Sequence, residues 1–181
     1  LSRGLGDVYK RQVLFFDNCD DDGPAIVDQR APALPFPIVT GRCDTGAPPN
    51  AGLARQRAMA LALSLAPGGV LMTTDADSLP APDWISANLA GLMRADVVAG
   101  RILHGFDHAA SPQARLEGYY DRLHALRRRI DPVPWEAVET HHWTSAASLA
   151  MRSDVYRESG GFPPVSYTHL TLPTHGRLWR S

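Results

Sequence analysis

The sequence has little cysteine and no long hydrophobic run. Its 181 residues include two cysteines, Cys19 and Cys43, and no Cys-x-x-Cys pair. That count excludes a disulfide framework and gives no zinc or redox motif, so we expect a reducing, cytoplasmic setting. No run of eighteen apolar residues occurs, and the N-terminus lacks the charged-then-apolar order of a signal peptide. These residues are therefore expected to contain no membrane segment, although a longer parent protein could lie at the inner face of a membrane.

The chain also lacks an excess of charge of either sign. Eighteen basic and nineteen acidic residues give a formal net charge of −1. Such a balance gives no electrostatic reason to expect nucleic acid or an anionic membrane as a partner. The hydrophobic share of 44% and the charged share of 20% are ordinary for a globular protein, and the length suffices for one domain with a real core.

Short apolar runs alternate with helical patterns along the middle of the chain. Asn50 is a candidate N-cap for the Ala- and Leu-rich stretch that follows it, and Gly68 lies just past the end of that stretch. Strands that alternate with helices at this spacing predict an α/β fold, a mainly parallel sheet with helices on both faces. The predicted strands are 13–17, 36–39, 68–74 and 95–102, the predicted helices are 50–66, 82–94 and 111–130, and a short strand and helix follow within 141–162.

The two ends do not continue the patterns of their neighbours. Residues 1–12 and 166–181 resemble read-through peptides of adapter sequence, which recur at the edges of gene fragments. We therefore expect a partial native domain over 13–165, flanked by two non-native ends.

Two aspartates, Asp75 and Asp77, follow the apolar run at 70–72. Carboxylates this close repel each other unless a cation or solvent separates them. Chance alone places about one Asp-x-Asp pair in a chain of this composition. A second pair, Asp20 and Asp22, lies in an acidic turn. The pair at 75 and 77 therefore gains meaning only from its place after a predicted strand.

That place favours a metal site. Ligands of an open parallel sheet gather where the strands end, and side chains at i and i+2 of an extended chain point to the same side. Mg²⁺ is usually held by one or two carboxylates together with substrate phosphates. Asp75 and Asp77 therefore predict a site for a divalent cation shared with a phosphorylated ligand.

Four segments, in this order, resemble the landmarks of glycosyltransferase family 2. They are VLFFDNCDDDGP at 13–24, NAGLARQRAMALA at 50–62, GGVLMTTDADSLPAPDWISANL at 68–89 and TSAASLAMRSDVYRESGGF at 144–162. The resemblance covers residues 13 to about 164. It implies a truncated nucleotide-diphospho-sugar transferase fold of the GT-A, Rossmann-like type. It also implies an inverting transfer of sugar from a nucleotide-diphosphate donor to an acceptor, which can be a saccharide, a lipid or a small molecule.

The resemblance also assigns roles to individual residues. Asp77, with Asp75, matches the ligands of Mg²⁺ or Mn²⁺ on the donor diphosphate. His142 and Trp143 fall where the family has its acceptor-side wall, and since adjacent side chains diverge, only one of His141 and His142 is expected to face a pocket. The positions that match nucleotide contacts are Asp17, Asn18, Asp22, Arg55 and Asp75.

The family's general base is an acidic residue shortly after its Gly-Gly-Phe element. Here "PPV" follows Gly160, Gly161 and Phe162, so the expected base after Gly161 is absent, and we expect this chain to be inactive. Two alternatives stay open: a nucleotidyltransferase, which can use a similar acidic pair, and a non-catalytic nucleotide-binding or structural fragment.

Overall fold

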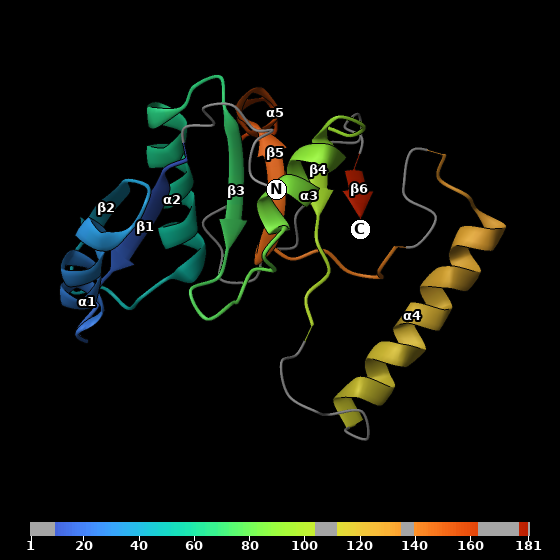
Figure 1. Cartoon of the computed structure of the whole chain (residues 1–181). Helices are drawn as coiled ribbons and strands as arrows, with labels where there is room; N and C mark the ends of the chain where they lie inside the picture. Colours follow the sequence, from blue (N-terminus) through green and yellow to red (C-terminus); the bar gives the residue numbers. More distant parts are fainter. Residues whose placement is uncertain (1–9, 104–111, 135–139, 163–177, 181) are drawn as a thin grey trace. The chain divides into compact units, whose positions relative to one another are not determined.

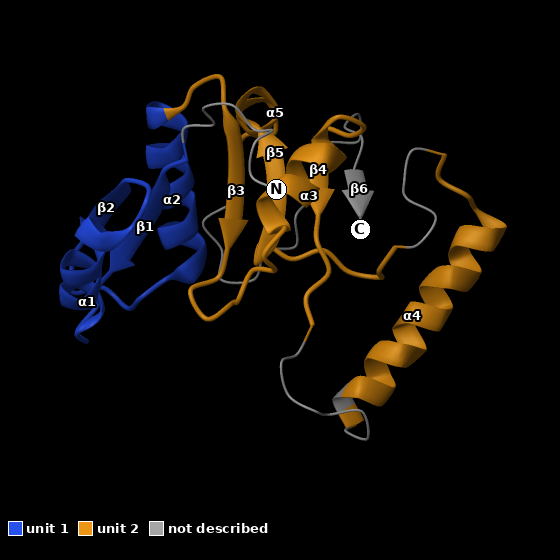
Figure 2. Cartoon of the chain, in the orientation of Figure 1, with its two compact units in different colours: residues 1–65, 161–168 blue, residues 66–160, 169–181 orange. Residues whose placement is uncertain are grey.

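The chain folds into helices and two small sheets (Figure 1). This computed structural model describes residues 10–103, 112–134, 140–162 and 178–180. Contacts divide the chain into two compact units (Figure 2). Unit 1 comprises residues 1–65 and 161–168, and unit 2 comprises residues 66–160 and 169–181.

Unit 1 is built on a parallel pair of strands. Strand β1, Gln12–Asp17, runs beside β2, Ile38–Cys43, and helix α2, Ala51–Leu65, packs against β1. The two strands are joined by helix α1, Gly23–Arg30, and the 3-10 turn η1, Ala31–Ala33. This is a strand–helix–strand connection, the unit from which parallel sheets are made.

Two local contacts shape the packing of unit 1. Asn50 Oδ1 accepts a hydrogen bond from the backbone N of Leu53 at 2.9 Å, which confirms Asn50 as the N-cap of α2. Gly41 lies opposite Phe15 in the strand pair, and a Cβ at Gly41 would be 2.6 Å from Phe15 Cδ2. The Phe15 ring therefore lies directly on the backbone of β2, where only glycine leaves room for it.

Unit 2 contains a four-stranded sheet in the order β3-β5-β4-β6. Its core is apolar: Leu71, Val98, Leu149 and Met151 are buried. Helices α3 and α5 pack against the sheet. The elements are β3 (Val70–Thr74), α3 (Trp84–Leu92), β4 (Val97–Ala99), α4 (Pro112–Ile130), β5 (Ser148–Arg152), α5 (Ser153–Glu158) and β6 (Leu178–Arg180).

The α/β class is confirmed, but this sheet is mixed rather than mainly parallel. Strand β5 is antiparallel to both of its neighbours, β3 and β4, whereas β4 pairs with β6 in parallel. The path of the chain gives the reason. The connection from β4 to β5, which contains α4, leaves after Ala99 and returns at Ser148, and Gly100 N donates to Ser148 O at 2.9 Å. A connection that returns at the edge it left makes the next strand run the opposite way.

Most predicted elements of the middle of the chain are confirmed, with shifted ends. The second strand begins at Ile38 and continues to Cys43, beyond the expected 36–39, and α1 was not predicted. Strand β6 falls inside the segment 166–181, which was expected to be non-native. The remaining residues of that segment and residues 1–9 lie outside the described residues, so the assignment of the ends stays a prediction.

Candidate functional site

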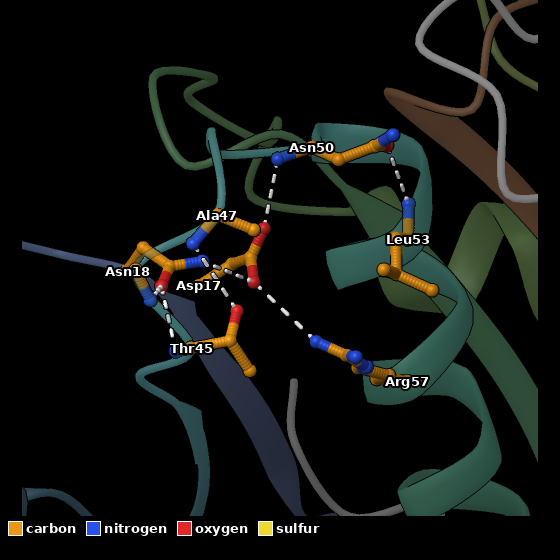
Figure 3. A network of polar contacts seen from close by, with 8 residues as sticks. Asp17, Asn18, Thr45, Ala47, Asn50, Leu53 and Arg57 are labelled. Carbon is orange, nitrogen blue, oxygen red and sulfur yellow. Dashed lines mark hydrogen bonds and ion pairs between the residues drawn. The ribbon is translucent and has the colours of Figure 1, made fainter.

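The predicted nucleotide contact Asp17 lies at the C-terminal end of β1, in a network of polar contacts (Figure 3). Its Oδ2 accepts a hydrogen bond from the backbone N of Asn50 at 2.8 Å, and its Oδ1 lies 3.4 Å from Arg57 Nη1. The side chain of Asp17 is only 8% exposed. Asp17 thus connects the end of β1 to the first turns of α2, a structural task that the sequence did not reveal.

Asn18 organises the loop that follows β2. Its Oδ1 accepts hydrogen bonds from the backbone N atoms of Thr45, at 2.8 Å, and Gly46, at 3.0 Å, and its Nδ2 donates to Asp17 Oδ1 at 3.2 Å (Figure 3). Asn18 has a φ of 50°, in the left-handed region that asparagine tolerates better than most residues. The pair at 17–18 therefore holds together the two loops at the ends of β1 and β2.

Arg57 also belongs to this network, although the sequence did not predict it. It lies two residues after the predicted contact Arg55, and its guanidinium also lies 5.7 Å from the centre of the Phe15 ring. Arg55 itself is half-buried on α2. Asp22 is exposed at the start of α1, and its backbone O accepts from Ile26 N at 2.9 Å. Arg57 could have been predicted only from the helical periodicity of α2, which would place position 57 on the side that faces β1.

In unit 2, Asp75 and Asp77 lie in a turn directly after β3. The backbone O of Asp75 accepts from Ser78 N at 3.1 Å; Asp75 is half-buried and Asp77 is exposed. The residues that the structure describes contain no group of three or more His, Cys, Asp or Glu side chains able to hold a metal. A cation at Asp75 and Asp77 would therefore take its other ligands from water or from a phosphorylated ligand.

Three polar segments meet at the edge of the sheet where β3 ends. Thr74, the last residue of β3, pairs with Ser148, the first residue of β5, and Ala99, the last of β4, pairs with Leu149. Trp84 Nε1 donates to Ser148 Oγ at 3.1 Å, which secures the start of α3 at the same edge. The acidic turn after β3, the segment after β4 and the segment before β5 thus share one edge of one sheet.

The two adjacent histidines of that last segment have different environments. His141 is buried, its Nε2 lies 3.1 Å from Ala99 O, and its Nδ1 contacts Trp143 O. The side chain of His142 is 21% exposed. The two side chains therefore differ in burial, and the expectation that only one of them faces a pocket stays a prediction.

His142 belongs to a cluster of charged and aromatic side chains. Its Nδ1 donates to Asp121 Oδ1 at 3.1 Å, and Arg101 Nη2 donates to Asp121 Oδ2 at 2.7 Å. The hydrogen bond from His142 is the largest cause of a lowered pKa at Asp121; partial burial opposes it, and the charge of Arg101 adds to it. The Tyr120 ring stacks on His142 with centroids 5.3 Å apart, and Trp143 lies tilted at 6.5 Å.

Asp121 and Arg101 were not singled out from the sequence. Arg101 lies 20 positions before Asp121 and His142 lies 21 positions after it, and no motif links the three residues. Only the return of the chain to the sheet edge after α4 brings them together.

Comparison with protein-family models, with curated proteins and with solved structures found no match for this chain. Among the described residues, no helix is both long and apolar enough to cross a bilayer.

Proposed function

We propose that this chain is a partial glycosyltransferase domain of the GT-A type, whose parent transfers a sugar from a nucleotide-diphosphate donor with inversion. The observation that supports this most is the position of Asp75 and Asp77, which lie in a turn at the strand end of a buried sheet. Ligands of α/β proteins gather at such strand ends.

In this proposal Asp77, helped by Asp75, holds Mg²⁺ or Mn²⁺ against the donor diphosphate. A cation held there would supply positive charge to stabilise a departing diphosphate. Asp77 suits the task because it is exposed, whereas Asp75, which is half-buried, is better placed to orient its neighbour. The predicted nucleotide contacts in unit 1 remain predictions.

The acceptor side is proposed to involve His142 and Trp143. They precede β5 and so belong to the edge that carries the acidic turn. An exposed indole and an imidazole oriented by Asp121 offer a flat apolar surface beside a hydrogen-bonding group. The position expected for the family's general base follows Phe162 and lies outside the described residues.

Calorimetry with Mn²⁺ and a series of nucleoside diphosphates tests the proposal. Metal-enhanced binding to the whole chain is expected, with a loss of at least about tenfold in affinity in Asp77→Asn, because one charged ligand of the cation is removed. Asp83→Asn is the matched control, since Asp83 is an exposed carboxylate at the start of α3 whose side chain makes no capping hydrogen bond. Equal binding with and without the metal contradicts the proposal.

One observation favours a non-catalytic structural role as a second candidate. The side-chain oxygens of Asp17 and Asn18 make contacts with other groups of unit 1. If this network has only a structural role, the chain should bind no nucleoside diphosphate, with or without Mn²⁺. The calorimetric titration described above therefore distinguishes the structural role from the transferase proposal.

A further inference from the structure

Helix α4 carries its apolar side chains on an exposed face. Five of them are between 43% and 76% exposed, and together with the half-buried Leu123 they are adjacent or spaced three or four residues apart. Side chains at this spacing fall on one side of a helix, so they form a continuous stripe. We call this the α4 stripe: Leu116, Tyr119, Tyr120, Leu126 and Ile130, with the half-buried Leu123 between them.

The opposite face of α4 attaches the helix to the rest of unit 2, and it does so with polar groups. Asp121 binds Arg101 and His142, and His124 Nε2 lies 2.6 Å from Thr140 Oγ1. The usual arrangement, with the apolar face inward and the polar face in water, is reversed here. Because α4 is attached mainly through polar contacts on one face, its stripe stays exposed, although the Tyr120 ring at its border also stacks on His142.

Arginines border the stripe along its whole length. Arg115, Arg122 and Arg129 recur every seventh residue, which is about two helical turns, so they form one row. All three are exposed, and each lies three or four residues from Tyr119 or Leu126, next to the stripe. The helix contains five arginines against Glu117 and Asp121, which gives it a formal charge of +3 within a chain of net charge −1.

The arginine row beside the apolar stripe favours one kind of partner over another. Two antiparallel copies of α4 joined through their stripes would place their arginine rows side by side, and Asp121 already pairs with Arg101 on the other face. A lipid surface that carries anionic headgroups instead offers an apolar layer for the stripe and negative charge for the arginines beside it. Tyrosines suit the boundary between the two layers.

We propose that the α4 stripe docks on the surface of an anionic lipid bilayer, with the helix lying in the plane of the interface. Nineteen residues give a helix about 28 Å long at about 1.5 Å per residue, so the stripe offers a long contact. The inference does not depend on the proposed transferase activity. It rests on the positive charge of α4, which the net charge of the whole chain does not reveal.

Co-sedimentation of the whole chain with vesicles tests the proposal. Vesicles of phosphatidylcholine with phosphatidylserine are expected to bind the protein, pure phosphatidylcholine vesicles should bind it much less, and added salt should weaken the binding. Leu126→Asp is expected to lower the partition coefficient about tenfold or more, and Arg122→Gln about fivefold. Both positions are exposed, so neither change should prevent folding, which circular dichroism verifies.

The controls are changes of the same kind on unit 2 outside α4. Met93→Asp and Arg94→Gln alter exposed residues after α3 and should leave vesicle binding unchanged. Equal binding to both kinds of vesicle, or full binding by Leu126→Asp, overturns the proposal. So does a stripe-dependent dimer in light scattering without any vesicle binding, because it would show that a second copy covers the stripe.

Discussion

His142 donates a hydrogen bond from Nδ1 to Oδ1 of Asp121 at 3.1 Å and so joins the segment before β5 to the middle of α4. Asp121 also accepts a hydrogen bond from Arg101, so one carboxylate on α4 connects the segment after β4 and the segment before β5. This cluster, together with the contact between His124 and Thr140, attaches α4 to the rest of unit 2.

Asp121→Asn should destabilise the protein and flatten its response to acid. The pKa of Asp121 is lowered in the folded state, so its contribution to stability is present above the ordinary Asp pKa and disappears as the pH falls through the lowered value. At pH 7 we expect a loss of about 1 kcal/mol in the free energy of unfolding. Urea unfolding between pH 7 and pH 3 measures both effects. An identical pH dependence in the two proteins would contradict this account of the cluster.

Asp17→Ala should be among the more damaging changes in unit 1. It leaves the backbone N of Asn50 and the guanidinium of Arg57 without their carboxylate, and the site is 8% exposed. A loss of about 2–3 kcal/mol in the free energy of unfolding is expected. Asp22→Asn is the control, because Asp22 is exposed and makes no side-chain cap, so its effect should stay within about 0.5 kcal/mol. Similar losses in both variants would show that Asp17 has no special structural role.

Gly41→Ala should destabilise the strand pair by overpacking. The new Cβ would meet Phe15 Cδ2 at 2.6 Å, so the ring must move at a cost of about 1–3 kcal/mol. Gly68→Ala is the control, since a Cβ there meets nothing within 4 Å. Thermal unfolding compares the two. Adding Phe15→Leu should recover part of the loss at position 41, and no recovery would point away from the ring as the cause.

The sequence predicted the elements whose signals are local. Asn50 and the alanine- and leucine-rich run after it identified α2, and the apolar run before Asp75 identified β3. The direction of β5 was not predictable, because it depends on where the chain re-enters the sheet after α4 rather than on the residues of β5 itself.

The site was predictable only in part, for the same physical reason. Asp75 and Asp77 are two residues apart, so their shared turn follows from the local sequence. The pairs Arg57 with Asp17 and His142 with Asp121 each join distant positions through tertiary packing. The sequence correctly predicted a helix over 111–130, yet it could not show that the apolar side of α4 faces outward, because burial is decided by neighbouring elements.

The signal of free Mn²⁺ in electron paramagnetic resonance tests the central claim, a cation shared between Asp77 and a nucleoside diphosphate. The free Mn²⁺ signal is measured in two samples that contain Mn²⁺ and uridine diphosphate at equal concentrations, one with the native chain and one with Asp77→Asn. We predict that the native chain removes more of the free signal than the variant, and that the difference requires the diphosphate. Equal signals from the two proteins would contradict the assignment of Asp77 as a metal ligand.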